Sequence, residues 1–174
     1  MKQNIVLRKL ELKDTDGMLE WMNDQESREF FRFPSDYAKP ANVIKFIESA
    51  NIEPVENESI HYAIVNEKDE YLGTISLKNI DMKVKKAEYA IALRKTARSK
   101  GVGTRATKLI LDKAFNKIGL NKVYLNVLSN NKRAIVLYEK VGFVFEGEFR
   151  QDIYINGKIQ SLRWYSILKE EYIK

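Results

Sequence analysis

The chain has 174 residues, of which 44% are hydrophobic and 31% are charged, and its formal net charge is +6. This length and apolar content predict one globular domain over residues 1–174 with a substantial core, and they exclude a disordered chain. The sequence has no apolar run near the ~20 residues of a membrane-spanning helix and no signal sequence at its start. We therefore expect a cytoplasmic protein without a membrane partner.

The cysteine and histidine content of the sequence excludes several kinds of catalytic and metal-binding site. Cysteine is absent, which excludes disulfides, thiolate zinc sites and a cysteine nucleophile. The single histidine, His61, cannot form a histidine-rich metal site, and we expect no metal. A Ser-His-Asp triad would depend on His61 alone, which we interpret as a structural or exposed residue at the start of a strand. Carboxylates, hydroxyl groups, backbone dipoles and a bound cofactor remain available.

The first half of the sequence predicts a strand, two helices and an antiparallel meander. Alternating apolar residues indicate strands, apolar residues at helical spacing indicate helices, and two charged turns separate the three strands of the meander. The predicted elements are a strand at 5–10, a helix capped by Asp14 or Thr15 that runs through Trp21 and Met22, a helix at 41–50, and strands at 60–65, 71–78 and 87–93.

The second half alternates helices and strands. Residues 101–118 have the pattern of an amphipathic helix, and Gly119 follows at the position where glycine ends helices. Asn156-Gly157 predicts a tight hairpin turn. The remaining predicted elements are a strand at 123–128, a helix at 131–140 stopped by Gly142, and strands at 143–149, 152–155 and 161–168. Together the two halves predict one α/β domain with a mixed sheet.

The most informative stretch is 87–106, where a strand enters a basic, glycine-containing loop that leads into a helix. The first N–H groups of a helix have no partner within the helix, and the helix dipole places partial positive charge there. Gly101 and Gly103 permit a close approach to these amides, and Arg98, Lys100 and Arg105 add positive charge. This arrangement predicts an anion site suited to a pyrophosphate.

Two other interpretations of this stretch are less favoured. The spacing from Gly101 to Ala106 also matches the dinucleotide fingerprint of nicotinamide enzymes, which needs an acidic residue about 20 positions on, after the next strand. The sequence at 128–131 is Leu-Ser-Asn-Asn, without an acid. Two glycines in an ordinary turn would be simpler still, but the coincidence of strand, basic loop and helix argues against that explanation.

Two motifs, in order, resemble the signatures of the GCN5-related N-acetyltransferases. The first, Arg98-Ser-Lys-Gly101-Val-Gly103, is similar to the family pattern Arg/Gln-x-x-Gly-x-Gly/Ala. The second begins at Asn131, continues through a helix bearing Ala134 and Tyr138, and ends in Gly142-Phe143. The resemblance covers nearly the whole chain, and the tail at 146–157 is similar to the branch that contains ribosomal-protein and spermidine acetyltransferases.

The resemblance implies a mostly antiparallel sheet, flanked by helices and splayed at the strand that holds acetyl-CoA. The loop at 98–105 would bind the pyrophosphate, the end of the 87–93 strand would pair with the pantetheine arm, and the N–H of Ile91 would polarise the thioester carbonyl. The implied acetyl-CoA-binding residues are Ile91, Ala92, Leu93, Arg98, Ser99, Lys100, Gly101, Val102, Gly103, Thr104, Arg105, Asn131 and Arg133.

Tyr138 and Glu88 are the candidate catalytic residues for direct acetyl transfer to a primary amine. The amine must lose its proton before attack, since its free pKa is about 10, and Glu88 could hold the water that serves as base. A tyrosine phenol such as that of Tyr138 could protonate the departing thiolate. The simpler alternatives are that Tyr138 is a core residue at helical spacing and that Glu88 is an exposed strand charge.

The acceptor stays open at this point. Residues 28–37 contain three phenylalanines and a tyrosine, which could form an aromatic lid or belong to the core. Arg28 and Arg32 accompany the acidic Glu29 and Asp36, which disfavours a polyamine and would suit an amino-sugar nucleotide. A peptide N-terminus on a basic protein would prefer an acidic groove, which the sequence does not show. A homodimer is expected by resemblance alone.

The sequence disfavours two functions of other classes. A non-catalytic acetyl-CoA sensor of the same fold is disfavoured because both motifs and Tyr138 are retained. An RNA-binding or ribosome-associated module would use the net charge of +6, but such modules usually present aromatic residues within a basic sheet face, and no such signature is visible. We therefore expect nucleic acid not to be the partner.

Overall fold

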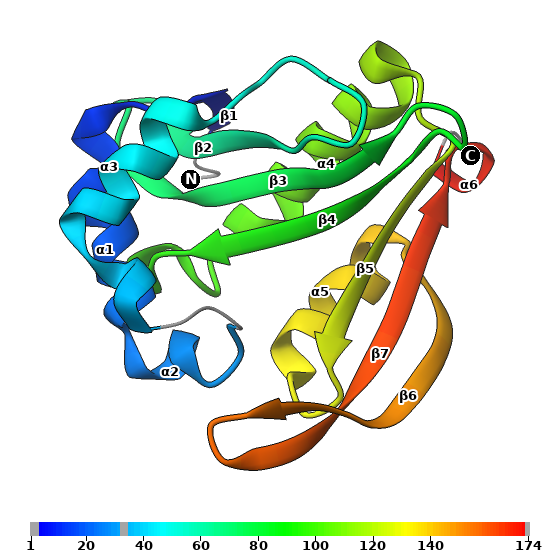
Figure 1. Ribbon diagram of the computed structural model, residues 1–174. Coiled ribbons are helices and arrows are strands. Elements are labelled where there is room, and N and C mark those ends of the chain that lie inside the picture. Colours follow the sequence, from blue (N-terminus) through cyan, green and yellow to red (C-terminus); the bar gives the residue numbers. More distant parts are fainter. Residues whose placement is uncertain (1–3, 32–34, 173–174) are drawn as a thin grey trace.

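The computed structural model describes residues 4–31 and 35–172, whose strands form one seven-stranded sheet in the order β1-β2-β3-β4-β5-β7-β6 (Figure 1). Every neighbouring pair of strands is antiparallel except β4 and β5, which are parallel. The predicted α/β class, with a mixed and mostly antiparallel sheet flanked by helices, is confirmed.

Most elements lie within a few residues of the predicted ranges, and α2 is the main helix that the periodicity missed. The strands are β1 (Ile5–Lys9), β2 (Ile60–Asn66), β3 (Tyr71–Asp81), β4 (Lys86–Leu93), β5 (Lys122–Leu128), β6 (Val144–Ile155) and β7 (Lys158–Leu168). The helices are α1 (Thr15–Asn23), α2 (Gln25–Arg28), α3 (Pro40–Ser49), α4 (Val102–Asp112), α5 (Lys132–Val141) and α6 (Lys169–Tyr172).

One predicted helix ends where expected but changes type, and one predicted strand division is wrong. The helix expected over 101–118 ends at Gly119, at φ 81°, but it is α-helical only to Asp112 and π-helical over Lys113–Ile118. The two strands expected at 143–149 and 152–155 are one strand, β6, whose register shifts between Phe149 and Ile153. The irregular pairing leaves the strand continuous but interrupts the alternation of apolar and polar residues along it. Because the prediction used that alternation, it divided β6 into two strands.

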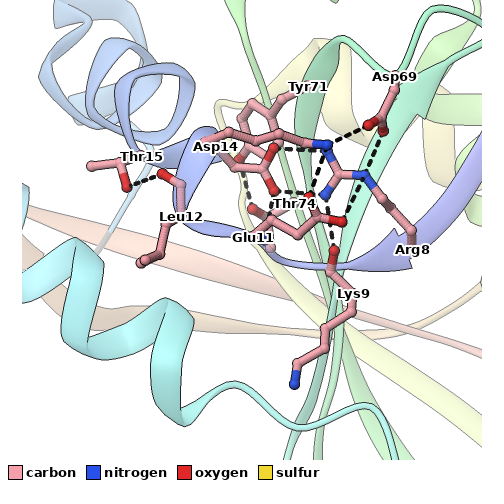
Figure 2. Close-up of polar contacts among 10 residues, drawn as sticks. Arg8, Lys9, Glu11, Leu12, Asp14, Thr15, Asp69, Tyr71 and Thr74 are labelled. Atoms are coloured by element: carbon pink, nitrogen blue, oxygen red, sulfur yellow. Dashed lines mark hydrogen bonds and ion pairs between the residues drawn. The ribbon is translucent and has the colours of Figure 1, made fainter.

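The start of α1 is held by a cluster of charged side chains rather than by a side-chain cap (Figure 2). The Asp14 carboxylate accepts hydrogen bonds from both terminal nitrogens of Arg8, each at 2.8 Å, and from the Glu11 N–H at 2.9 Å. Asp69, in the turn between β2 and β3, accepts from Arg8 Nε at 2.6 Å. Asp14 is the N-cap residue of α1, as predicted, but its carboxylate bonds Arg8 and the Glu11 N–H instead of the amides of α1. Thr15 donates to the Leu12 carbonyl.

Helices cover the two faces of the sheet at different places. Tyr89 of β4 and Val123 of β5 face α4 and α5 and belong to the larger core cluster. Ala92 of β4 points to the opposite face, where it packs with residues of α1 and α3 such as Met18 and Val43. Because side chains alternate along a strand, β4 contributes to both cores and is fixed from both sides.

The sheet opens between its two parallel strands. β4 and β5 pair only at Lys86–Glu88 against Lys122–Tyr124. Beyond Glu88, β4 continues along β3 to Leu93, while β5 continues along β7 to Leu128. Figure 1 shows the two strands diverging from the end of the sheet near α6, with α5 alongside β5. The divergence leaves one side of β4 without a partner strand over its last five residues.

Candidate active site

A cavity of about 830 Å³ lies at the divergence of β4 and β5. Its wall is built from β3, β4, β5, α2 with the residues just after it, the loop before α4, the first turn of α4, and α5. The structure thus gathers residues from seven parts of the chain, which the two sequence motifs only partly cover. The predicted site residues that line it are Glu88, Ile91, Leu93, Arg98, Ser99, Gly101, Gly103, Thr104, Asn131, Arg133 and Tyr138.

Four predicted residues do not line this cavity: Ala92, Lys100, Val102 and Arg105. Ala92 and Val102 are buried in the core on either side of the sheet. The Arg105 side chain folds back on the loop, where Nη2 donates to the Lys100 carbonyl at 3.1 Å. Any contact of these four residues with a ligand would have to be made by the backbone or after a side-chain movement.

The first turn of α4 has the geometry of an anion site. Gly101 precedes the helix with φ 73°, a left-handed conformation that glycine adopts without strain, and its carbonyl accepts the Arg105 N–H at 3.2 Å. The N–H groups before Arg105 therefore have no partner within the helix. A Cβ on Gly103 would lie 3.2 Å from Leu137 Cδ2 of α5, so glycine lets the first turn of α4 approach the middle of α5 closely. The amides without a helical partner fit a pyrophosphate, and Arg105 Nε on the same helix is buried without a partner among the described residues.

Arg98 lines the cavity, but its guanidinium group already holds α2. Nε donates to the Leu93 carbonyl at 3.2 Å, Nη1 bonds Asp24 at 2.9 Å, and Nη2 donates to the Ser27 hydroxyl. Only 10% of the Arg98 side chain is exposed. Burial tends to raise the pKa of Asp24, but the hydrogen bonds from Arg98 and Ser27 outweigh it and hold that pKa below its ordinary value. The structural role of this arginine was not visible in the motif.

The first turn of α5 carries Asn131 and Arg133. The Asn131 side chain accepts the Ala134 N–H at 3.2 Å and so caps the helix, which gives this motif residue a structural role of its own. Arg133 is exposed and pairs with Glu26 of α2 at 2.6 Å. Whether either side chain also contacts acetyl-CoA stays a prediction.

Tyr138 lies in the wall of the cavity on α5 and is held by other aromatic rings. Its ring packs edge-on to Tyr89, with centroids 5.8 Å apart, and against Phe143 at 5.9 Å. No hydrogen bond to its hydroxyl group is formed by the residues that the structure describes. Burial raises the pKa of Tyr138 well above its ordinary value, so the phenol keeps its proton at neutral pH. Tyr138 is therefore a buried core residue that also lines the cavity.

Glu88 lies at the last position where β4 and β5 pair, and it is neither free nor simply exposed. Its carboxylate accepts from Lys78 Nζ at 3.0 Å, from Asn79 at 3.3 Å and from Asn126 of β5 at 3.4 Å. Lys78 and Asn126 also line the cavity and were missed from the sequence. The register of the β3–β4 hairpin, which pairs Lys78 with Glu88, was the signal that could have found Lys78.

The aromatic segment at 28–37 contributes two rings to the cavity. Phe30 packs beside Leu128, and Phe31 packs against Trp21 with ring centroids 5.2 Å apart. Both rings are packed and line the cavity, in agreement with the core alternative, and a lid movement stays a prediction. Arg32, Phe33 and Pro34 of this segment lie outside the described residues.

Comparison with known proteins places this geometry in a family. The family model described as an acetyltransferase (GNAT) domain matches residues 4–144. The chain belongs to the GNAT acetyltransferase family. It is therefore an N-acetyltransferase, as the two motifs predicted, and the relatives and structural neighbours agree with that assignment.

Two relatives and one solved structure illustrate which members of the family the chain is similar to. A spermidine N(1)-acetyltransferase of Escherichia coli is 31% identical over 130 residues, which are 74% of this chain and 70% of that protein. An uncharacterised N-acetyltransferase of Bacillus licheniformis is 27% identical over 172 residues, covering 98% and 96%. The crystal structure of spermidine N-acetyltransferase from Vibrio cholerae in complex with CoA and spermine matches with a TM-score of 0.84, at 25% identity over 98% of each chain.

The described residues contain neither a membrane-spanning helix nor a cluster of metal-ligating side chains. No helix among them is long and apolar enough to cross a membrane. No group of three or more His, Cys, Asp or Glu side chains in the described part is placed to hold a metal ion.

Proposed function

We propose that this GNAT enzyme transfers an acetyl group from acetyl-CoA to a primary amine by direct attack, at the cavity between β4 and β5. The observation that carries the proposal is the meeting of three features in one cavity: an unpaired strand edge, the open first turn of α4, and the Tyr138 side chain. Acetyl-CoA would supply the acetyl group as an activated thioester.

The residues of the chain have separate tasks in this proposal. Backbone amides at the first turn of α4 bind the pyrophosphate, and the free edge of β4 between Glu88 and Leu93 pairs with the pantetheine arm. An N–H on that edge stabilises the oxyanion by about 3–4 kcal/mol. As the C–N bond forms and the C–S bond breaks, a water near Glu88 takes the proton of the amine. Tyr138 gives its proton to the departing sulfur and regains one from solvent.

An alkyl polyamine is the acceptor class that we propose. The sequence argued against it through Arg28 and Arg32. Arg32 lies outside the described residues, and the Arg28 guanidinium group turns back to α1, where it donates to the Met22 carbonyl and to Asn23, each at 3.2 Å. Arg28 does not line the cavity, whereas Glu88 does, paired with Lys78. The names of the relatives from Escherichia coli and Vibrio cholerae add support for this class.

The test is thiol release from acetyl-CoA with three acceptor pools: polyamines, amino-sugar nucleotides, and peptides with free N-termini. We expect release with the polyamine pool and little with the other two. Release confined to another pool would contradict the acceptor class but keep the reaction. No release with any pool, together with no thermal stabilisation by acetyl-CoA, would contradict the function itself.

A further inference from the structure

The segment 24–31, here called the strap, contributes Ser27, Phe30 and Phe31 to the wall of the candidate cavity. Its Asp24 and Ser27 bind Arg98, which belongs to the loop before α4. In the middle of the strap the Arg28 carbonyl accepts from Asn156 Nδ2 of the β6–β7 turn at 3.0 Å. The strap therefore joins both sides of the opening between β4 and β5.

Glu26 of the strap places its carboxylate between two arginine side chains. One carboxylate oxygen lies 2.6 Å from Arg133 Nη1 of α5, and the other lies 3.2 Å from Arg98 Nη1. These two arginines stand beside the first turns of the two helices that flank the opening, and both line the cavity. Within the described residues, the Glu26 carboxylate is the negative charge shared by this arginine pair.

The two contacts of the strap differ in strength. The Arg98–Asp24 pair is largely buried, with side-chain exposures of 10% and 17%, and it anchors the strap. The Arg133–Glu26 pair is exposed, at 52% and 44%, so water and salt weaken it. A phosphate group binds an arginine with charge-assisted, often bidentate hydrogen bonds, as a carboxylate does, and CoA brings several such groups. The exposed contact is thus the one that an incoming phosphate can replace while the strap stays anchored.

We propose that Glu26 is an internal competitor of the phosphate groups of CoA for Arg133, and that it sets the affinity of the enzyme for the coenzyme. When CoA binds, Arg133 turns from Glu26 to a phosphate group and the centre of the strap is released. Phe30 and Phe31 follow Glu26 within five residues and line the same cavity, so the release changes the wall of the cavity at these two rings. The inference rests on the proposed coenzyme site and adds a residue outside both sequence motifs.

The test compares the dissociation constant of CoA for the wild type and Glu26→Gln by calorimetry at low salt. Glutamine keeps the shape of the side chain and removes its charge, so we expect CoA to bind about two- to fivefold more tightly, the equivalent of one exposed ion pair. The gain should shrink in high salt. The KM for acetyl-CoA should fall by a similar factor while kcat changes little, which a purely structural role of Glu26 would not produce.

Two further variants make the result specific. Glu20→Gln removes an exposed carboxylate that pairs with Arg94, outside the strap and the cavity, and should leave the affinity unchanged. In an Arg133→Gln background, Glu26→Gln should give a smaller gain than in the wild type. Unchanged or weaker CoA binding by Glu26→Gln, with normal binding by the wild type, would overturn the inference alone. Failure of the wild type to bind CoA would overturn the proposed function and the inference with it.

Discussion

At the scale of single residues, Tyr138 is the position where sequence and structure agree best. Its helical spacing with Ile135 predicted a core residue and its motif predicted a catalytic one, and the side chain is both buried and part of the cavity wall. Periodicity could place the ring but not the cavity, because the cavity exists only where β4 and β5 separate. The catalytic role itself remains a prediction.

We expect Tyr138→Phe to lower kcat by about 10²-fold and to leave CoA binding nearly unchanged, since only the proton donor is lost. Tyr89→Phe is the matched control, because this ring contacts Tyr138 but its hydroxyl group bonds Thr107 at 2.7 Å. That variant should lose stability of about 1 kcal/mol and keep its kcat. Steady-state kinetics on both variants tests this role. An unchanged kcat in Tyr138→Phe would show that Tyr138 is not the proton donor.

His61 gives a second prediction at this scale. The ring is largely buried, bonds Ser76 at 2.7 Å and packs against Phe46, and burial, aided by nearby Lys78, lowers its pKa to about 4. Between about pH 6.5 and pH 4 the unfolded chain binds a proton that the folded chain does not. Stability should therefore fall as the pH is lowered through that range, by at most ~1.4 kcal/mol per pH unit.

An NMR titration measures this pKa directly, because the chain has one histidine and its ring resonances are unambiguous. A midpoint near 4 would agree with the buried ring. A midpoint near 6.5 would mean that the imidazole is solvated and that His61 has no such effect on stability.

At the scale of elements, the sequence predicted α4 and α5 well and the strap poorly. Both helices carry a regular apolar face and a glycine at the C-terminal end of the helical run, signals that depend on neighbouring residues only. The strap is held by Arg98, which lies more than 70 positions further along the chain. No local pattern can show a contact over that separation, and the motif therefore presented Arg98 only as a coenzyme ligand.

We expect Arg98→Met to destabilise the fold by about 2–3 kcal/mol, because it leaves the mostly buried Asp24 without its cation. The pKa of Asp24 is depressed in the folded chain, so this contribution is present above about pH 4 and is lost as the pH falls through the lower, folded value. Urea unfolding should show a difference from the wild type that is larger at pH 7 than at pH 3.

Arg163→Met is the control, since the Arg163–Glu148 pair bridges two strands at the surface, with side-chain exposures of 33% and 31%. It should cost much less than Arg98→Met. Equal losses in the two variants would show that Arg98 does not anchor the strap.

At the scale of the whole molecule, the order of elements was enough to predict the fold class, and the resemblance was enough to predict the divergence of the sheet. The extent of the divergence was not predictable, because it depends on how far β5 follows β7 rather than β4. The cluster of polar side chains around Glu88 was also not predictable from the sequence, because Lys78, Glu88 and Asn126 come from three different strands. Charge counts along the sequence could not show that the Arg28 side chain turns back to α1.

The central claim is that CoA binds along the free edge of β4, and hydrogen exchange with and without saturating CoA tests it most directly. In the free protein the β4 amides on the side facing β5 beyond Glu88 lack a partner strand, whereas those facing β3 are paired. We predict that CoA slows exchange in peptides covering 86–93 and 98–105 and leaves β1 and β2 unchanged. Unchanged exchange at β4, under conditions where CoA is shown to bind, would mean that the coenzyme binds elsewhere and would contradict the account.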